Sequence, residues 1–192
     1  MKRHPDRRRQ QVPAAKRGSW FQAKRPIFQF VVVLAVLMGL FYASTMTRVF
    51  QERIYPAYLQ WNAQASAAIL RLCGEDARTE GATIVSSRFQ VHIKRGCEAI
   101  EPSALFAAAV LAFPAPWRRR LMGVLLGVLL LAIINLVRIV SLYYVGVHAP
   151  RIFEAMHVEV WQPVFIALAL VLWILWALWA TKPKKAPSHA AD

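Results

Sequence analysis

Three polar residues stand beside apolar runs, and their types are those that acyl transfer uses. Cys97 precedes "EAIEPSALFAAAVLAF", Arg138 interrupts "LLLAIINLVRIVSLYYVGV", and His157 precedes a Trp-rich apolar run. A cysteine near a cation ionises readily to the nucleophilic thiolate. An imidazole can form an ion pair with it and then protonate a leaving amine, while a fixed guanidinium can stabilise an oxyanion. The set favours nucleophilic acyl transfer.

Two further polar residues can support this group. Asn135 precedes Arg138 by three residues, and that spacing places both on one face of a helix. Asn135 can therefore orient the guanidinium or donate a hydrogen bond itself, and Glu154 can orient His157 from one turn away. No cofactor or metal site is expected, because the two cysteines form no CxxC pair and no phosphate-cradling glycine-rich loop is present.

Each candidate also has a purely structural interpretation. Cys97 can form a disulfide with Cys73 in an oxidising compartment. Arg138 can extend along the helix to hold a lipid phosphate. His157 and Glu154 can be surface residues without a catalytic role. Two other histidines are rivals on the outer side, His92 and His148.

Four apolar runs must position these residues, and they predict four membrane spans. The runs lie at about 27–44, 98–113, 121–147 and 158–180, and the second is short and opens with charges. Trp161, Trp176 and Trp179 mark the two ends of the last run as an aromatic belt, and Tyr143 and Tyr144 are interpreted as interfacial aromatics. The expected fold is a mainly α polytopic membrane protein with about four transmembrane helices and a small outer helix-plus-hairpin insertion.

The outer insertion covers about residues 45–97. Apolar residues over 50–72 recur at helical spacing, Pro56 implies a break or kink, and Gly74 suits the end of the helix. In "ATIVSSRFQVHIKRGC" apolar and polar residues alternate around two serines, which predicts a β-hairpin. This hairpin is expected to deliver Cys97 to the outer end of the second span.

The formal charge of +14 is concentrated beside the ends of the spans. Nine Lys/Arg lie within residues 1–25, and two further clusters lie at 118–120 and 182–185. Four spans place all three clusters on one side, which the positive-inside rule assigns to the cytoplasm. Zinc-finger and RNA-binding motifs are absent, so nucleic acid is not an expected partner. The expected parts are a basic cytoplasmic tail at 1–26, a membrane domain at 27–180 and a second cytoplasmic tail at 181–192.

This topology brings the three candidates to one membrane face. Arg138 lies 18 residues after Arg120, or about 27 Å along a helix at 1.5 Å per residue. A hydrocarbon core is about 30 Å thick, so Arg138 is expected near its outer surface. Cys97 begins the second span there, and His157 precedes the fourth.

The motifs around these residues resemble the exosortase/archaeosortase family. The similar features are a cysteine in "GCEAI" at the mouth of a span, an arginine in "NLVRI" within the next, and a histidine in "MHVEVWQ" before the last. The resemblance covers roughly residues 45–170, and the short chain with "GCEAIE" is most similar to the exosortase H branch. Many family members have glycine two residues after the cysteine, where this chain has Ala99.

The resemblance implies a membrane-embedded cysteine transpeptidase or peptidase of the bacterial inner membrane, active on its periplasmic side. Its partners would be exported proteins that end in a short sorting motif, a transmembrane segment and a basic cluster. The resemblance assigns the nucleophile to Cys97, the catalytic arginine to Arg138 and the general acid/base to His157. A non-enzymatic assembly or scaffold protein with a Cys73–Cys97 disulfide is the alternative. A small transporter is disfavoured, because Arg138 is nearly the only charged residue within the predicted spans, whereas transporters usually have several polar positions there.

Overall fold

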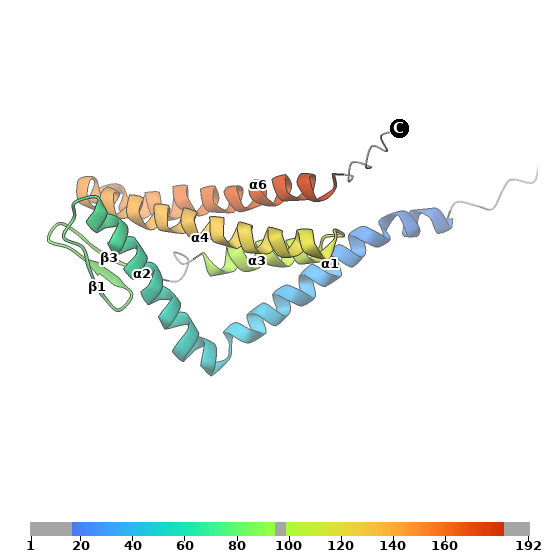
Figure 1. The fold of residues 1–192 in the computed structure, drawn as a ribbon, viewed down its shortest axis with the longest axis horizontal. Coiled ribbons are helices and arrows are strands. Elements are labelled where there is room, and N and C mark those ends of the chain that lie inside the picture. Colours follow the sequence, from blue (N-terminus) through green and yellow to red (C-terminus); the bar gives the residue numbers. More distant parts are fainter. Residues whose placement is uncertain (1–16, 95–98, 183–192) are drawn as a thin grey trace, which may run out of the picture.

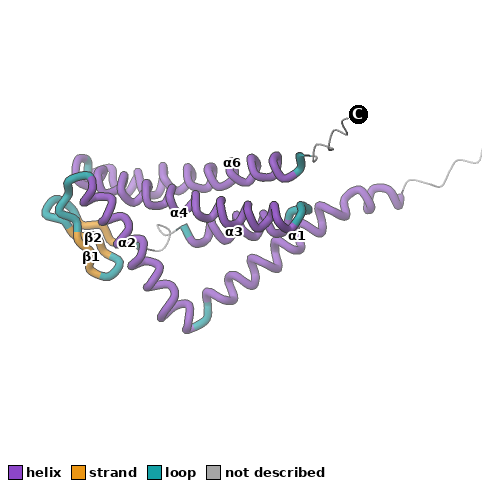
Figure 2. Tube along the Cα trace, viewed as in Figure 1, coloured by secondary structure: helices purple, strands orange, loops and turns teal. Residues whose placement is uncertain are grey.

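The structure is a computed structural model that describes residues 17–94 and 99–182, with side chains described from residue 24. The helices are α1 (Arg17–Thr45), α2 (Tyr55–Leu72), α3 (Ile100–Ala112), α4 (Trp117–His148), the short α5 (Phe153–Ala155) and α6 (Gln162–Ala180). Short π-helical turns, η1 (Phe50–Ile54) and η3 (Met156–Trp161), precede α2 and α6, and a 3-10 turn, η2 (Pro150–Ile152), follows α4. Figure 2 shows that helix dominates the chain, as predicted. Cys97 lies outside the described residues.

Within the described residues, three segments are long and apolar enough to cross a membrane. They are Lys24–Thr45, Trp117–His148 and Pro150–Ala180, and they contain the predicted first, third and fourth spans. The predicted second span corresponds to α3, which has 13 residues and is about 20 Å long at 1.5 Å per residue. Its end is fixed by the following "PAP", since proline cannot continue a helix. The chain therefore has the expected mainly α membrane fold, but three described helices, not four, are long enough to span, and α3 is shorter than the hydrocarbon core.

The helices form a near-parallel bundle with a V-shaped arm on one side (Figure 1). α3, α4 and α6 run side by side and pack on one another, whereas α1 and α2 diverge from a junction around η1. α1 packs on α3 and α2 packs on α4, so each arm of the V contacts a different helix of the bundle. We call the end of the bundle near His148 the sheet end and the end near Trp117 the basic end.

Small residues on α4 permit close approach of its neighbours. A Cβ atom added to Gly123 would overlap the Trp176 ring of α6, and one added to Gly127 would overlap the Phe106 ring of α3. Membrane helices associate largely through such tight packing of small against large residues. The bundle at this level therefore depends on glycine.

A small antiparallel sheet covers the sheet end of α2 and α4. Its order is β1 (Arg78–Glu80), β2 (Thr83–Val85) and β3 (Gln90–His92), with Ile84 opposite Val91. The predicted hairpin is β2–β3, and β1 is an additional strand that the sequence analysis did not predict. The predicted helix over 50–72 is divided into η1 and α2, with Pro56 in the first turn of α2 where it needs no hydrogen bond.

The arginine cluster at the basic end ties three helices together. Arg119 Nη1 donates to the carbonyl oxygens of Ala180, the last residue of α6, and Lys182, just after it, at 2.6 and 2.9 Å. Arg120 donates to the carbonyls of Leu111 and Ala115, at 3.0 and 2.8 Å, at the end of α3. The last carbonyls of a helix have no intrahelical partner and carry partial negative charge. These arginines are therefore helix caps as well as candidates for membrane anchoring.

Candidate functional site

Arg138 lies inside the bundle on α4, with only 2% of its surface exposed. Its Nη2 atom donates to the backbone carbonyl of His157 at 3.5 Å. The structure thus joins two of the three predicted site residues, from helical segments that are 19 residues apart in sequence. A buried guanidinium in an apolar bundle is costly and marks a candidate site.

His157 lies in η3, the π-helical stretch that leads into α6. The imidazole is half-buried, and its ring centroid lies 6.3 Å from that of Phe153. Glu154 is exposed in α5 just before it, and the charges of Glu154, Arg138 and Lys94 all act on the imidazole. Single π-helical turns within helices are frequent at functional sites.

Asn135 is fully buried and binds a residue that the sequence analysis did not single out. Its Nδ2 atom donates to Oδ1 of Asn62 on α2 at 3.1 Å, and Asn62 donates in turn to the Tyr58 carbonyl at 2.9 Å. Asn135 thus links α4 to α2 through this hydrogen bond. Asn62 could have been found from the sequence, because it lies with Ser66 on the otherwise apolar face of α2. A buried polar residue on such a face needs a hydrogen-bond partner.

The two rival histidines have local partners. His148, at the end of α4, forms a hydrogen bond between its Nδ1 atom and the Tyr144 carbonyl at 2.9 Å. His92, on β3, pairs its Nδ1 atom with the Thr83 hydroxyl across the hairpin at 2.7 Å. Both are exposed, whereas His157 is the histidine that meets Arg138.

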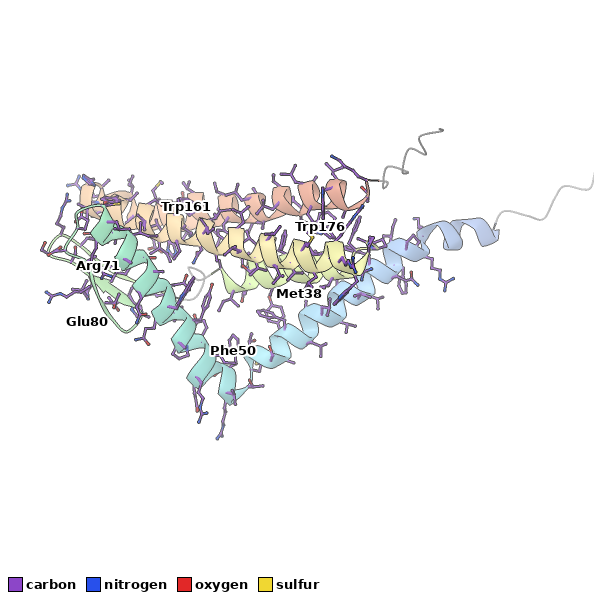
Figure 3. All side chains as sticks on the ribbon, in the orientation of Figure 1. Met38, Phe50, Arg71, Glu80, Trp161 and Trp176 are labelled. Carbon is purple, nitrogen blue, oxygen red and sulfur yellow. The ribbon has the colours of Figure 1, made fainter. Side chains whose placement is uncertain are left out.

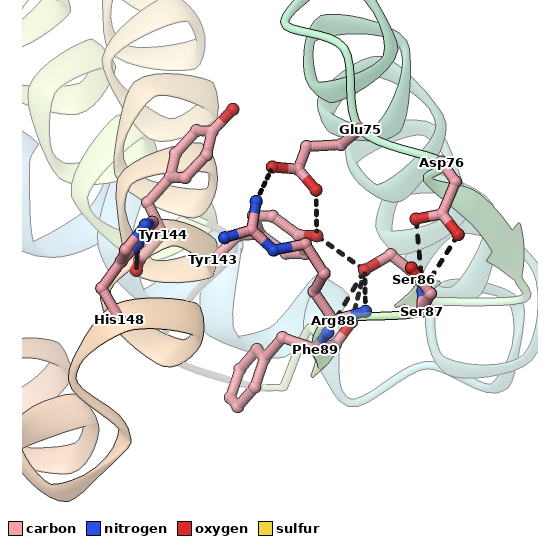
Figure 4. Close-up of polar contacts among 9 residues, drawn as sticks. All are labelled: Glu75, Asp76, Ser86, Ser87, Arg88, Phe89, Tyr143, Tyr144 and His148. Atoms are coloured by element: carbon pink, nitrogen blue, oxygen red, sulfur yellow. Dashed lines mark hydrogen bonds and ion pairs between the residues drawn. The ribbon is translucent and has the colours of Figure 1, made fainter.

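Tyr143 corrects one expectation, because it is fully buried and is not an interfacial aromatic. Its hydroxyl donates to Glu75 Oε2 at 3.0 Å and lies 2.6 Å from Ser86 Oγ, while Arg88 binds the other Glu75 oxygen at 2.8 Å (Figure 4). We call Tyr143, Glu75, Ser86 and Arg88 the Tyr143 cluster. It joins α4 to the sheet and to the end of α2.

The turn of the hairpin is fixed beside this cluster. The Ser87 backbone N–H lies 3.2 Å from each carboxylate oxygen of Asp76. Hydrogen bonds from the side chain and backbone of Ser87 hold the pKa of the Asp76 carboxyl below its usual value. The Phe89 ring packs on α4 at Gly146, where a Cβ atom would overlap it. The hairpin therefore packs against α4 at a defined position, with Phe89 on Gly146.

Arg138 and Ala99 line one cavity of about 550 Å³, which α1, α3 and α6 enclose. Ala99 is the first described residue after the gap and is 4% exposed. Its φ of 58° and ψ of 14° lie in the left-handed region, which favours glycine. A glycine would adopt this conformation without the steric cost that the Ala99 methyl group carries.

Within residues 17–94 and 99–182, no cluster of three His, Cys, Asp or Glu side chains has an arrangement that could hold a metal ion. Cys73 carries a free, exposed thiol at the end of α2. The described part of the site is therefore a buried arginine, a half-buried histidine and an apolar cavity, and it is suited to binding a carbonyl oxygen and moving a proton.

Comparison with known proteins gives one family. Residues 20–176 match the family model described as Transmembrane exosortase (Exosortase_EpsH). No curated protein and no solved structure matches the chain significantly. The family match extends from α1 to α6, so it covers the bundle, the V-shaped arm and the sheet.

Proposed function

The chain belongs to the transmembrane exosortase family, and we propose that it is a cysteine transpeptidase or peptidase that cleaves C-terminal sorting signals of exported proteins. Cys97 is the proposed nucleophile, Arg138 the oxyanion-binding group and His157 the general acid/base. The family membership confirms the resemblance found in the sequence. The activity and the residue roles are our proposal.

The observation that carries this proposal is the contact between Arg138 and the backbone of His157 beside the cavity. Arg138 is buried at 2% exposure and lines the same cavity as Ala99, which follows Cys97 by two residues. The described residue that follows the Cys97 segment thus shares a cavity with Arg138, which supports placing the nucleophile beside it.

The chemistry follows from these roles. The Cys97 thiolate attacks the carbonyl carbon of the scissile peptide bond, and the carbonyl oxygen becomes an oxyanion near the Arg138 guanidinium. As the C–N bond breaks, protonated His157 gives its proton to the leaving amine nitrogen, and an acyl thioester remains on Cys97. Water or an amine then attacks the thioester carbonyl and gives a proton to His157. The C–S bond breaks, which releases the acyl product and restores the Cys97 thiolate beside protonated His157.

The orientation is part of the proposal. The basic end, with Arg118, Arg119 and Arg120, faces the cytoplasm, and the sheet end faces the periplasm of a bacterial inner membrane. A substrate with its own membrane segment then presents the preceding residues at the level of Arg138. Reporter fusions at Glu75 and Pro150 should report the periplasm, and a fusion at Arg119 should report the cytoplasm.

The direct test is processing of a substrate tail in cells. The substrate is an exported protein from the same genome that ends in a short motif, a membrane helix and a basic cluster. Cys97→Ala should abolish cleavage while the variant accumulates in the membrane fraction. Cys73→Ala is the matched control, because Cys73 is exposed at the end of α2, and it should process the substrate normally.

The same pair of variants tests the scaffold alternative. A structural Cys73–Cys97 disulfide predicts equal loss of folded protein from both substitutions and resistance of both thiols to alkylation without reductant. The proposed enzyme instead requires a free thiol at Cys97, which a membrane-permeant alkylating reagent labels in intact cells.

A further inference from the structure

The cavity beside Arg138 is a trough with walls from three helices. α1 contributes Phe30 and Tyr42, α3 contributes Phe106, and α6 contributes Phe165 and Trp173. Figure 1 shows that α1 diverges from the bundle toward the sheet end. Met38 of α1, labelled in Figure 3, also lines the trough. The rings of Phe30 and Trp173 lie 6.1 Å apart and bound the trough toward the basic end.

The trough is open to the side, where the bilayer lies. Three of its apolar lining residues are about half exposed: Leu105 of α3 at 48%, and Ile166 and Leu170 of α6 at 55% and 56%. These side chains line a hollow and face the surroundings at the same time. A polypeptide segment in the bilayer can therefore reach the trough laterally, without passing through water.

The dimensions and lining suit an α-helix. Along α6 the trough extends from Gln162 to Trp173, which is about 16 Å or three helical turns at 1.5 Å per residue. Ala109 of α3 and Ala169 of α6 also line it. Small residues allow a second helix backbone to approach closely, as in other membrane helix contacts.

The charged and amide side chains of the lining lie at one end of the trough. Arg138, Glu101 and Gln162 line the end near Ala99, and the rest of the lining is aliphatic or aromatic, with Tyr42 and Trp173 carrying its other polar side-chain atoms. A membrane helix in the trough would therefore have its apolar length against α3 and α6. The residues just before that helix would lie beside Arg138 and Ala99.

We propose that this trough between α1, α3 and α6 binds the membrane helix of the protein substrate and aligns the preceding cleavage site with Arg138 and His157. This inference rests on the proposed peptidase function, and it adds the binding surface and the lateral route. Substrate selection is then partly a helix–helix contact inside the bilayer, separate from recognition of the short motif.

A pair of matched substitutions on α6 tests the proposal. Ile166 lines the trough, whereas Ile174, on the same helix and 42% exposed, does not. Ile166→Trp should slow cleavage of a membrane-anchored substrate tail by roughly 10- to 100-fold, since a bulky side chain in a packed contact costs about that much. Ile174→Trp should cleave it at the wild-type rate.

Two substrates distinguish failure of the trough from failure of the enzyme. The first is the tail with its membrane helix fused to a soluble reporter, and the second is the same motif as a peptide without the helix. Ile166→Trp should slow cleavage of the first substrate far more than cleavage of the second. Equal slowing of both would mean that the catalytic site is damaged and would overturn the trough proposal. Absence of cleavage of both by the wild-type protein would instead overturn the peptidase function.

Photo-crosslinking tests the occupant without requiring turnover. A benzoylphenylalanine at position 166 or 174 is introduced into the Cys97→Ala protein in membranes that contain the anchored substrate. Position 166 should crosslink to the substrate helix and position 174 should not. Crosslinks from position 166 to phospholipid alone would show that the trough is a lipid site and would overturn the proposal.

Discussion

Tyr143 and Arg138 are buried polar side chains little more than one turn apart on α4, yet their surroundings differ. The Tyr143 hydroxyl has two partners within hydrogen-bond distance, Glu75 and Ser86, and Glu75 is also bound by Arg88. Arg138 makes a long contact of 3.5 Å to a backbone carbonyl and lines a cavity. The first arrangement closes a contact between elements, whereas the second places a charge beside space for a ligand.

This difference separates two reasons for burying a polar group. A satisfied network holds elements in register, and its loss destabilises the fold. A buried charge beside a cavity can stabilise charge that develops in a reaction. Changes at Tyr143 should therefore reduce stability with little effect on cleavage per folded molecule. Changes near Arg138 should reduce cleavage with little effect on stability.

Among the described residues, the largest expected effect is at His157. His157→Ala should reduce substrate cleavage by about 100- to 10,000-fold, the usual contribution of a general acid/base. His148→Ala is the matched control and should be close to wild type, because His148 is exposed and binds its own helix. Cleavage in cells, normalised to the amount of enzyme in the membrane fraction, measures both. Loss in His148→Ala but not in His157→Ala would move the acid/base role to His148.

Arg138→Lys should follow, with a loss of about 100- to 1,000-fold in cleavage, as for removal of one oxyanion donor. Lysine keeps the charge but lacks the planar fork of donors. Arg138→Ala should lose at least as much. Arg118→Lys, an exposed change at the basic end, is the control. Near-normal cleavage by Arg138→Lys would leave Arg138 with a structural role as a buried cation that holds the His157 backbone.

Tyr143→Phe should change stability rather than chemistry. Removal of the hydroxyl leaves Glu75, whose side chain is 8% exposed, with one partner fewer, at a cost of about 1–3 kcal/mol. Thermal unfolding in detergent should show a lower midpoint, while cleavage per folded molecule stays near the wild-type value. Tyr144→Phe, on the less buried neighbour, should change the midpoint less. A selective loss of cleavage in Tyr143→Phe would bring Tyr143 into the site and end the contrast with Arg138.

The smallest expected effect is at Ala99. Ala99→Gly should stabilise the protein by about 1 kcal/mol, because glycine adopts the left-handed conformation without a Cβ clash. Ala99→Val should destabilise it, since a β-branched residue fits that conformation poorly. Unfolding midpoints of the two variants in the same detergent give the comparison. A lower midpoint for Ala99→Gly would mean that the buried methyl group matters more than the backbone conformation.

Much of the site was predictable because hydropathy and motif spacing are local properties. The apolar runs gave the long helices, and the turn chemistry gave the hairpin, with Val91 and Ile93 buried as alternation predicts. Arg138 and His157 were placed at one level by counting residues along helices. The β1 strand was missed because "RTE" has no apolar alternation and forms only by pairing with β2.

The sequence by itself determined the membrane fold, the family and the identity of the candidate residues, since apolar length and short motifs are encoded residue by residue. Only the tertiary structure decided which side chains contact one another. Asn135 binds Asn62 from 73 residues away, Tyr143 joins Glu75 and Ser86, and a trough forms between α1 and α6. Such contacts depend on how helices cross and which faces meet, and helical periodicity fixes a face without fixing its neighbour.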